Sequence, residues 1–144
     1  MNDFDPGFTE IRDLDTQATL RVSLFGVGPA PTALLFATYR QVDPLIITLE
    51  VRTPEEVTVF RRLLLRADFA VGLTGPTAHA GTRMLPVEGR MIEISFTEDG
   101  ASVAVRIPEA AARRFLGLSY RIVPIDDEGA VLGDLAAELA LDRG

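Results

Sequence analysis

The stretch from Arg66 to Pro86, RADFAVGLTGPTAHAGTRMLP, constrains the fold more than any other part of the chain. It begins with a short apolar segment, breaks at Gly72, and passes through a loop of small residues before extended structure returns near Arg83. Glycine adopts positive φ at little cost and proline cannot continue a helix. This order predicts a short helical turn, a stop at Gly72 with positive φ, a loop and a new strand. Apolar patterns lie on both sides, so the stretch is expected to cross between two segments of sheet.

Three strand patterns precede this crossover. Apolar and polar residues alternate from Gln17 to Leu24, residues 34–39 form a second run, and the apolar residues 45–51 form a third. Turn residues separate them, at GVGPAP and at Asp43-Pro44. Short connections predict an antiparallel meander. The acidic residues 1–16 are expected to be a flexible lead-in, with 17–144 forming a single domain.

Residues 53–65, TPEEVTVFRRLLL, fit two structures. The segment Thr53-Pro54-Glu55-Glu56 matches a helix capping box with proline at the first helical position, which favours a helix slightly. The alternation from Val57 to Arg62 also suits the returning arm of a hairpin. Both interpretations stay open on this evidence.

Strand patterns return after the crossover. Arg83–Leu85 begins one strand, and residues 91–96 and 102–107 form two more around the hairpin turn Glu98-Asp99-Gly100. Pro108 is expected to start a helix that ends near Gly117, followed by a brief extended piece over 120–124 and an amphipathic helix over 132–141. The predicted class is α+β, a mostly antiparallel twisted sheet with two to three helices.

The composition excludes several classes of protein and site. The chain has no cysteine, which excludes disulfides, thiol catalysis and thiolate metal sites. Its net charge of −7 repels the phosphate backbone of nucleic acids. No run approaches the roughly 18–20 apolar residues of a membrane span. The N-terminus lacks the basic and then apolar start of a secretory signal, so the cytoplasm is the expected compartment.

No group of residues predicts a catalytic, cofactor or metal site. His79 is the only histidine, and a G-x-S-x-G nucleophile motif is absent. In GVGPAP, two prolines remove backbone amides that a phosphate loop would need. The acidic run Asp126-Asp127-Glu128 does not continue into a calcium-loop pattern after Gly129. The chain is therefore expected to be no enzyme and to carry no cofactor.

A small cluster of arginines could bind nucleic acid. Arg61, Arg62 and Arg66 lie close in sequence to Phe60 and Phe69, which could stack on bases. On a strand, however, Arg61 and Arg62 point to opposite faces and would not form one patch.

One set of residues between 39 and 86 keeps a recognisable spacing. A tyrosine is followed four residues on by Asp-Pro and an apolar strand; an arginine stands six residues before Gly-Leu, and prolines follow that glycine after four and fourteen residues. The set consists of Tyr39, Asp43, Pro44, Arg66, Gly72, Leu73, Pro76 and Pro86, with Arg83 at a basic position. Through this set, residues 39–86 resemble the SsgA-like family of sporulation and cell-division proteins of filamentous actinobacteria, especially its SsgB branch. The resemblance implies a strand over about 57–63 and a short helix over about 64–71.

The chain departs from the family pattern at several positions. Ala78, His79, Ala80 and Gly81 occupy a loop that tends to read Gly-x-Gly-Asp in the family, and Leu85 stands where a tryptophan is usual. The chain contains no tryptophan at all. It therefore resembles a divergent member.

The resemblance implies a function as well as a fold. It implies a whirly-like domain assembled as a homotrimer, and a non-enzymatic adaptor at division septa that recruits the tubulin-like division GTPase. The nine spaced residues would then serve structure or partner contact. The alternatives are a whirly-like single-stranded nucleic-acid-binding protein, which a basic groove would favour, and a small-ligand barrel, which a deep pocket would favour.

Overall fold

The structure, a computed structural model, describes residues 2–28 and 30–127. The described elements are, in chain order, β1 (Asn2–Leu14), β2 (Gln17–Phe25), β3 (Ala33–Arg40), β4 (Ile46–Arg52), β5 (Thr58–Leu65), α1 (Arg66–Gly72), β6 (Thr77–His79), β7 (Thr82–Val87), β8 (Met91–Glu98), β9 (Ala101–Pro108) and α2 (Glu109–Ile122). Residues 125–127 are also helical. The α+β class and the mostly antiparallel sheet are confirmed, whereas the whirly-like label stays a prediction.

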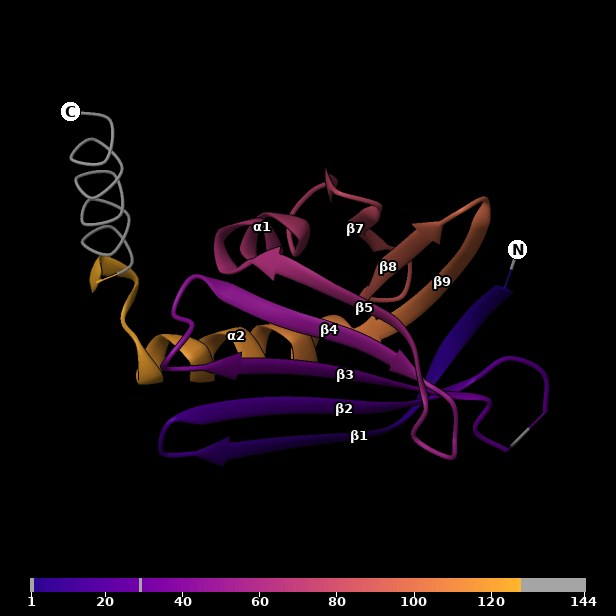
Figure 1. The fold of residues 1–144 in the computed structure, drawn as a ribbon, viewed down its shortest axis with the longest axis horizontal. Helices are drawn as coiled ribbons and strands as arrows, with labels where there is room; N and C mark the ends of the chain where they lie inside the picture. Colours follow the sequence, from indigo (N-terminus) through magenta and orange to yellow (C-terminus); the bar gives the residue numbers. More distant parts are fainter. Residues whose placement is uncertain (1, 29, 128–144) are drawn as a thin grey trace.

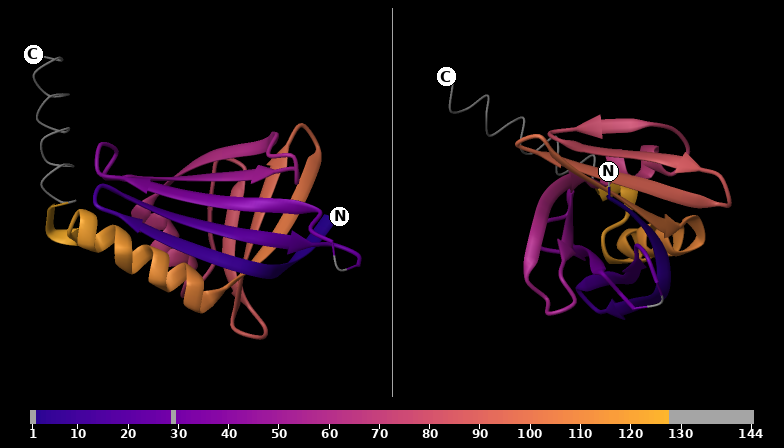
Figure 2. Two further views of the ribbon diagram at one scale, coloured as in Figure 1. Left: turned by 90° about the horizontal axis from the view of Figure 1, so that it is seen from below. Right: turned by 90° about the vertical axis from the view of Figure 1, so that its right-hand side faces the viewer.

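The described strands form one sheet in the order β5-β4-β3-β2-β1-β9-β8-β7-β6. All neighbouring pairs are antiparallel except β1 and β9, which run parallel. Two half-sheets, β1–β5 and β6–β9, meet at this parallel pair and diverge from it, with α2 lying between them (Figures 1 and 2). The crossover predicted for residues 66–86 is confirmed, because α1 leads from the last strand of one half-sheet to the first strand of the other.

The expectation of a flexible lead-in is wrong for residues 2–14. These residues form β1, whose later part pairs with β2 while Asn2–Phe4 pairs with β9. The register shifts between Pro6 and Thr9, where the strand passes from one half-sheet to the other. Phe4 and Ile11 pack against the core from this strand. Its acidic residues suggested a solvated segment, but two strand partners and a few apolar contacts are enough to make it the link of the sheet.

The core lies on the inner face of the sheet, beneath α1 and α2. Period-two alternation buries one face of β2, β3, β4 and β8, as the sequence predicts. Two aromatic pairs lie within it: Phe60 stacks on Phe96 with ring centroids 5.9 Å apart, and Phe69 meets Phe115 edge to face at 5.8 Å. The first pair joins β5 to β8, so side chains connect the half-sheets at the side opposite β1 and β9.

Helix α2 is longer than predicted. It continues past Gly117 to Ile122, so the predicted extended piece over 120–124 is wrong for its first part. Gly117 lies on the exposed face, while Phe115, Leu118 and Ser119 continue the buried face. Burial of this apolar face offsets the modest helical cost of one glycine. The helix ends just before Pro124, as the restriction on pre-proline residues favours.

Replacing Gly117 by alanine is expected to raise the free energy of unfolding by about 0.5–1 kcal/mol, because alanine loses less backbone entropy in a helix. A Cβ atom added at Gly117 meets nothing within 4 Å. Urea unfolding monitored by circular dichroism measures the change. A lower stability in this variant would contradict the exposed placement of residue 117.

The conformation predicted for Gly72, within the crossover, is also wrong. Gly72 does not take positive φ; it is the last residue of α1, and the glycine with positive φ in this stretch is Gly81, at 81°. What requires glycine at position 72 is space, since an added Cβ would lie 2.6 Å from Cγ of Met84.

For residues 53–65, the strand followed by a short helix is confirmed by β5 and α1. The helix predicted over 132–141 lies outside the described residues.

Candidate partner-binding surfaces

Three of the nine spaced residues form a buried cluster. The Tyr39 hydroxyl donates a hydrogen bond to the Pro44 carbonyl oxygen at 2.9 Å. The Arg66 guanidinium lies 4.9 Å from the Tyr39 ring centroid and 4.8 Å from that of Tyr120. Both Arg66 and Tyr39 are fully buried. The cluster therefore places a cation against two aromatic rings, where desolvation strengthens the attraction.

The same arginine also closes the end of α2. Nη1 of Arg66 donates to the carbonyl oxygen of Ser119 at 3.1 Å and to that of Val123 at 2.7 Å. These carbonyls belong to the last turn of the helix and its C-cap, where intrahelical donors run out and a positive charge is favourable. Arg66 thus connects the β3–β4 turn, the start of α1 and the end of α2. Its environment indicates a structural function.

The remaining spaced residues do not join this cluster. Gly72 and Leu73 are buried against the inner face near Met84. Asp43 is exposed in the β3–β4 turn, where its carbonyl accepts a hydrogen bond from the Ile46 amide at 3.1 Å. Pro76, Arg83 and Pro86 lie on or beside β6 and β7, and Arg83 is exposed. The nine residues therefore occupy several places and form no single contact site.

The residues considered for chemistry are similarly dispersed. His79 is exposed at the end of β6. Within residues 2–28 and 30–127, no group of three or more histidine, cysteine or acidic residues is arranged to hold a metal ion. No helix formed by the described residues is long and apolar enough to cross a membrane.

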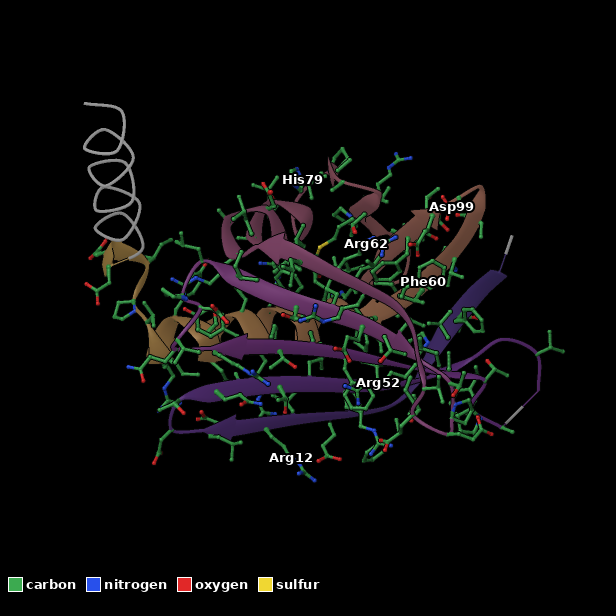
Figure 3. The ribbon with its side chains drawn as sticks, viewed as in Figure 1. Arg12, Arg52, Phe60, Arg62, His79 and Asp99 are labelled. Carbon is green, nitrogen blue, oxygen red and sulfur yellow. The ribbon has the colours of Figure 1, made fainter. Side chains whose placement is uncertain are left out.

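The aromatic residues considered for base stacking are not accessible. Phe60 and Phe69 are both buried and pack against Phe96 and Phe115. Arg61 and Arg62 do lie on opposite faces: Arg61 approaches Glu50 on the outer face at 3.4 Å, while Arg62 donates to the Thr97 carbonyl of β8 at 3.2 Å. Figure 3 shows Arg62 beside Phe60, on the side of β5 that approaches β8. The predicted separation of the two arginines is confirmed.

Sequence reasoning missed a surface on the outer face of β1–β5. Strand register places one continuous row of residues across all five strands: Glu10, Arg21, Phe36, Glu50 and Arg61. We call the outer face of these strands the arginine face, after the five arginines that it carries, Arg12, Arg21, Arg40, Arg52 and Arg61. Arg12 and Arg52 are labelled on this half-sheet in Figure 3. The sequence signal for this surface is the set of polar residues that alternate with the buried residues along each strand. These residues indicate a common surface only once the strands are placed side by side.

Ring and ion contacts order the middle of the arginine face. The Arg52 guanidinium lies 4.1 Å from the Phe36 ring centroid and Arg21 lies 5.7 Å from it. Arg52 also donates from Nε to Glu50 at 2.8 Å. Two hollows flank this group, one of about 260 Å³ over β3–β5 and one of about 250 Å³ over β1–β3. The arginine face is thus a polar surface with two hollows, and contacts among Arg52, Phe36 and Glu50 hold its central side chains in place.

A second surface follows the edge strand. In the described sheet, β5 is a terminal strand, hydrogen-bonded to β4 on one side. Apolar side chains along it and its preceding loop are solvent-exposed: Val57 at 62%, Val59 at 53%, Leu63 at 53% and Leu65 at 43%. An edge strand with exposed apolar residues is a surface on which another chain can pack. We call it the apolar edge.

These features define an α+β protein built on one twisted, mostly antiparallel sheet, with surfaces suited to protein contacts on its outer face and edge. The model of the family described as Streptomyces sporulation and cell division protein, SsgA, matches residues 35–128, which is more than half of the chain. The chain belongs to this SsgA family of actinobacterial sporulation and cell-division proteins.

Individual relatives agree with this assignment. The sporulation-specific cell division protein SsgB of Frankia casuarinae is 28% identical over 134 residues, covering 89% of this chain and 90% of the relative. The crystal structure of an SsgA-like sporulation-specific cell division protein from Thermobifida fusca has a TM-score of 0.68 at 24% identity, covering 88% of this chain and 96% of the other. A structure of SsgB from Streptomyces coelicolor, described with mutations in SsgB that correlate to longitudinal cell division during sporulation, has a TM-score of 0.64 at 20% identity, covering 86% of this chain and 97% of the other. These two likenesses show a shared fold.

Proposed function

We propose that the chain is a non-enzymatic adaptor of sporulation-associated cell division. It acts in the cytoplasm at division septa and helps to position the septum by recruiting the tubulin-like division GTPase through protein–protein contacts. The observation that carries the proposal is the family match over residues 35–128, since that family supports a role in sporulation septation. The exposed arginine face and apolar edge supply surfaces of the kind an adaptor needs.

A pelleting assay tests this function. Purified protein is mixed with filaments of the host's division GTPase assembled with GTP, and the pellet is compared with one from a GTP-free mixture. Saturable co-sedimentation that requires GTP is the expected result. Absence of co-sedimentation at concentrations in the tens of micromolar, with folded protein, would reject direct recruitment, because a complex with a Kd in the micromolar range would be detected at these concentrations.

The alternative function, binding of single-stranded nucleic acid, has less support. Such proteins combine a basic groove with aromatic rings on which bases stack. Phe60 and Phe69 are buried, and the Phe36 ring is flanked by Arg21 and Arg52. Glu10 and Glu50 also lie among the arginines of the outer face, where they would repel phosphates. The adaptor function fits these residues better.

We further propose that the protein is a homo-oligomer, a trimer as the family resemblance implies, and that the apolar edge forms its interface. A terminal strand offers unpaired backbone groups, and the neighbouring Leu63 and Leu65 would be removed from water by a second copy.

Replacing Leu63 by glutamate is expected to shift the oligomer to monomer, because the carboxylate would have to be buried in the interface. Sedimentation equilibrium measures the mass of each variant. Val42→Glu is the matched control, since Val42 is 81% exposed and lies in the β3–β4 turn, outside β5. An unchanged mass for the Leu63 variant would remove the apolar edge from the interface.

A further inference from the structure

The arginine face concentrates positive charge on a protein whose net charge is −7. Five arginines share it with two carboxylates, those of Glu10 and Glu50, while Asp43 and Glu56 lie at its rim. We propose that this face binds an extended acidic segment of a partner protein, whose aspartate or glutamate side chains pair with the arginines. The inference rests on the proposed adaptor function, because it names the chemistry of a segment through which a partner is held.

Some of these arginines are available to a partner. Among residues 2–28 and 30–127, Arg21 and Arg40 have no carboxylate within ion-pair distance. Arg12 and Arg61 do contact Glu10 and Glu50, but their side chains are 70% and 61% exposed. Arginine presents several donors in a planar fork and pairs with carboxylates in a bidentate geometry. A partner carboxylate can therefore add to each of these guanidinium groups without displacing a buried contact.

The spacing of the strands suits an extended peptide. A row of residues crosses the half-sheet from Arg12 on β1 through Thr19 and Thr38 to Thr48 on β4, which shares a hollow with Arg61 on β5. Thr19 lines one hollow together with Arg12 and Arg21, and Thr38 and Thr48 line the other together with Arg40 and Arg61. Four strand spacings of about 4.8 Å span roughly 19 Å, which about six extended residues cover. Threonine hydroxyls along this path can hydrogen-bond the peptide backbone.

The same observations favour a carboxylate peptide over a polynucleotide. The Phe36 ring, half-buried between two arginines, leaves no open aromatic surface for stacking on this face. A peptide can interrupt its acidic residues with neutral ones opposite Glu10 and Glu50, whereas a nucleic acid carries a phosphate on every residue. The mixed charge of the face therefore matches a chain of mixed acidic and neutral side chains.

Fluorescence anisotropy tests the inference directly. The probe is a fluorescein-labelled peptide of about ten residues in which glutamates alternate with neutral residues. It is titrated with the full chain at low and at physiological salt, because ion pairs weaken as the Debye length falls from about 30 Å to 8 Å. The test variant carries Arg12→Gln and Arg61→Gln. The matched control carries Arg83→Gln and Arg114→Gln, exposed residues of β7 and α2 whose replacement changes the net charge equally. Thermal melting verifies that both variants fold.

The expected result is a loss of affinity of about fivefold or more in the test variant and less than about twofold in the control, since each exposed charge pair contributes a few tenths to 1 kcal/mol. Equal losses in both variants would show nonspecific attraction and overturn the inference. So would the absence of binding by the unchanged protein. Tighter binding of a thymidine decanucleotide than of the peptide, lost in the test variant, would assign the face to nucleic acid instead.

This experiment separates the inference from the proposed function. Peptide binding without co-sedimentation with the division GTPase would keep the acidic-segment site and reject that partner. Co-sedimentation that is unaffected in the Arg12 and Arg61 variant would keep the adaptor function and place its contact on another surface.

Discussion

Replacing Arg66 by alanine is expected to lower the free energy of unfolding by about 3–4 kcal/mol, because it removes charge-assisted hydrogen bonds and cation–π contacts from a buried site. The side chain is fully buried, donates to the carbonyls of Ser119 and Val123, and lies against the rings of Tyr39 and Tyr120. Without it, the last carbonyls of α2 lose a donor inside the protein. Urea unfolding followed by circular dichroism gives the free energy.

Two further variants determine whether geometry or charge matters at position 66. Arg66→Lys keeps the charge but lacks the planar fork, and is expected to lose roughly half as much stability. Arg114→Ala, at an exposed position on α2, controls for the loss of an arginine and should change stability by less than about 0.5 kcal/mol. If Arg66→Ala were as stable as Arg114→Ala, the structural function assigned to the buried cluster would be wrong.

Replacing Gly72 by valine is expected to lower the free energy of unfolding by about 2–3 kcal/mol, within the range that overpacking a core produces. The Cβ atom alone would lie 2.6 Å from Cγ and 2.7 Å from Sδ of Met84, which is fully buried. The Met84 side chain or the end of α1 must therefore move. Thermal and urea unfolding both measure the loss.

The cause of that loss can be isolated. Gly75→Val, in the loop that follows α1, adds a Cβ with no neighbour within 4 Å and is expected to be nearly neutral. Combining Gly72→Val with Met84→Ala should cost less than the sum of the two single changes, because the second change removes the atoms that clash. Full additivity would show that Met84 is not the obstacle.

Much of the sheet was predictable from local pattern. The alternation in residues 17–24, 34–39 and 91–96 identifies strands because burial of one face imposes a period of two. The turn Glu98-Asp99-Gly100 was predictable because its last two residues tolerate positive φ, at 49° and 83° in the structure. Short connections then led to antiparallel pairing.

The errors lie where distant contacts outweigh local preference. Residues 2–14 carry acidic side chains, yet they form β1 because β2 and β9 both pair with them. Gly117 lies inside α2 because the buried face of the helix continues beyond it. β2 follows β1 directly in the chain, but β9 is far from β1 in sequence, and the core against which α2 packs comes from other elements, so local pattern did not predict either outcome.

For the candidate sites too, some features were visible in the sequence and others were not. The spacing of Tyr39, Arg66 and Gly72 was visible in the sequence, but their functions were not, since Arg66 meets carbonyls more than fifty residues away and Gly72 meets Met84. The arginine face was not foreseen at all, because its members come from five strands and are separated by as many as forty-nine positions.

By itself, the sequence determined the α+β class, most of the strands, the crossover at residues 66–86 and the resemblance to the SsgA family. Each of these depends on neighbours along the chain or on the spacing of residues within one stretch. The tertiary structure alone decided that β1 links the half-sheets, that Arg66 closes α2, and that arginines from separate strands share the outer face. Strand register and helix packing set these arrangements, and both depend on side chains brought together only when the whole sheet forms.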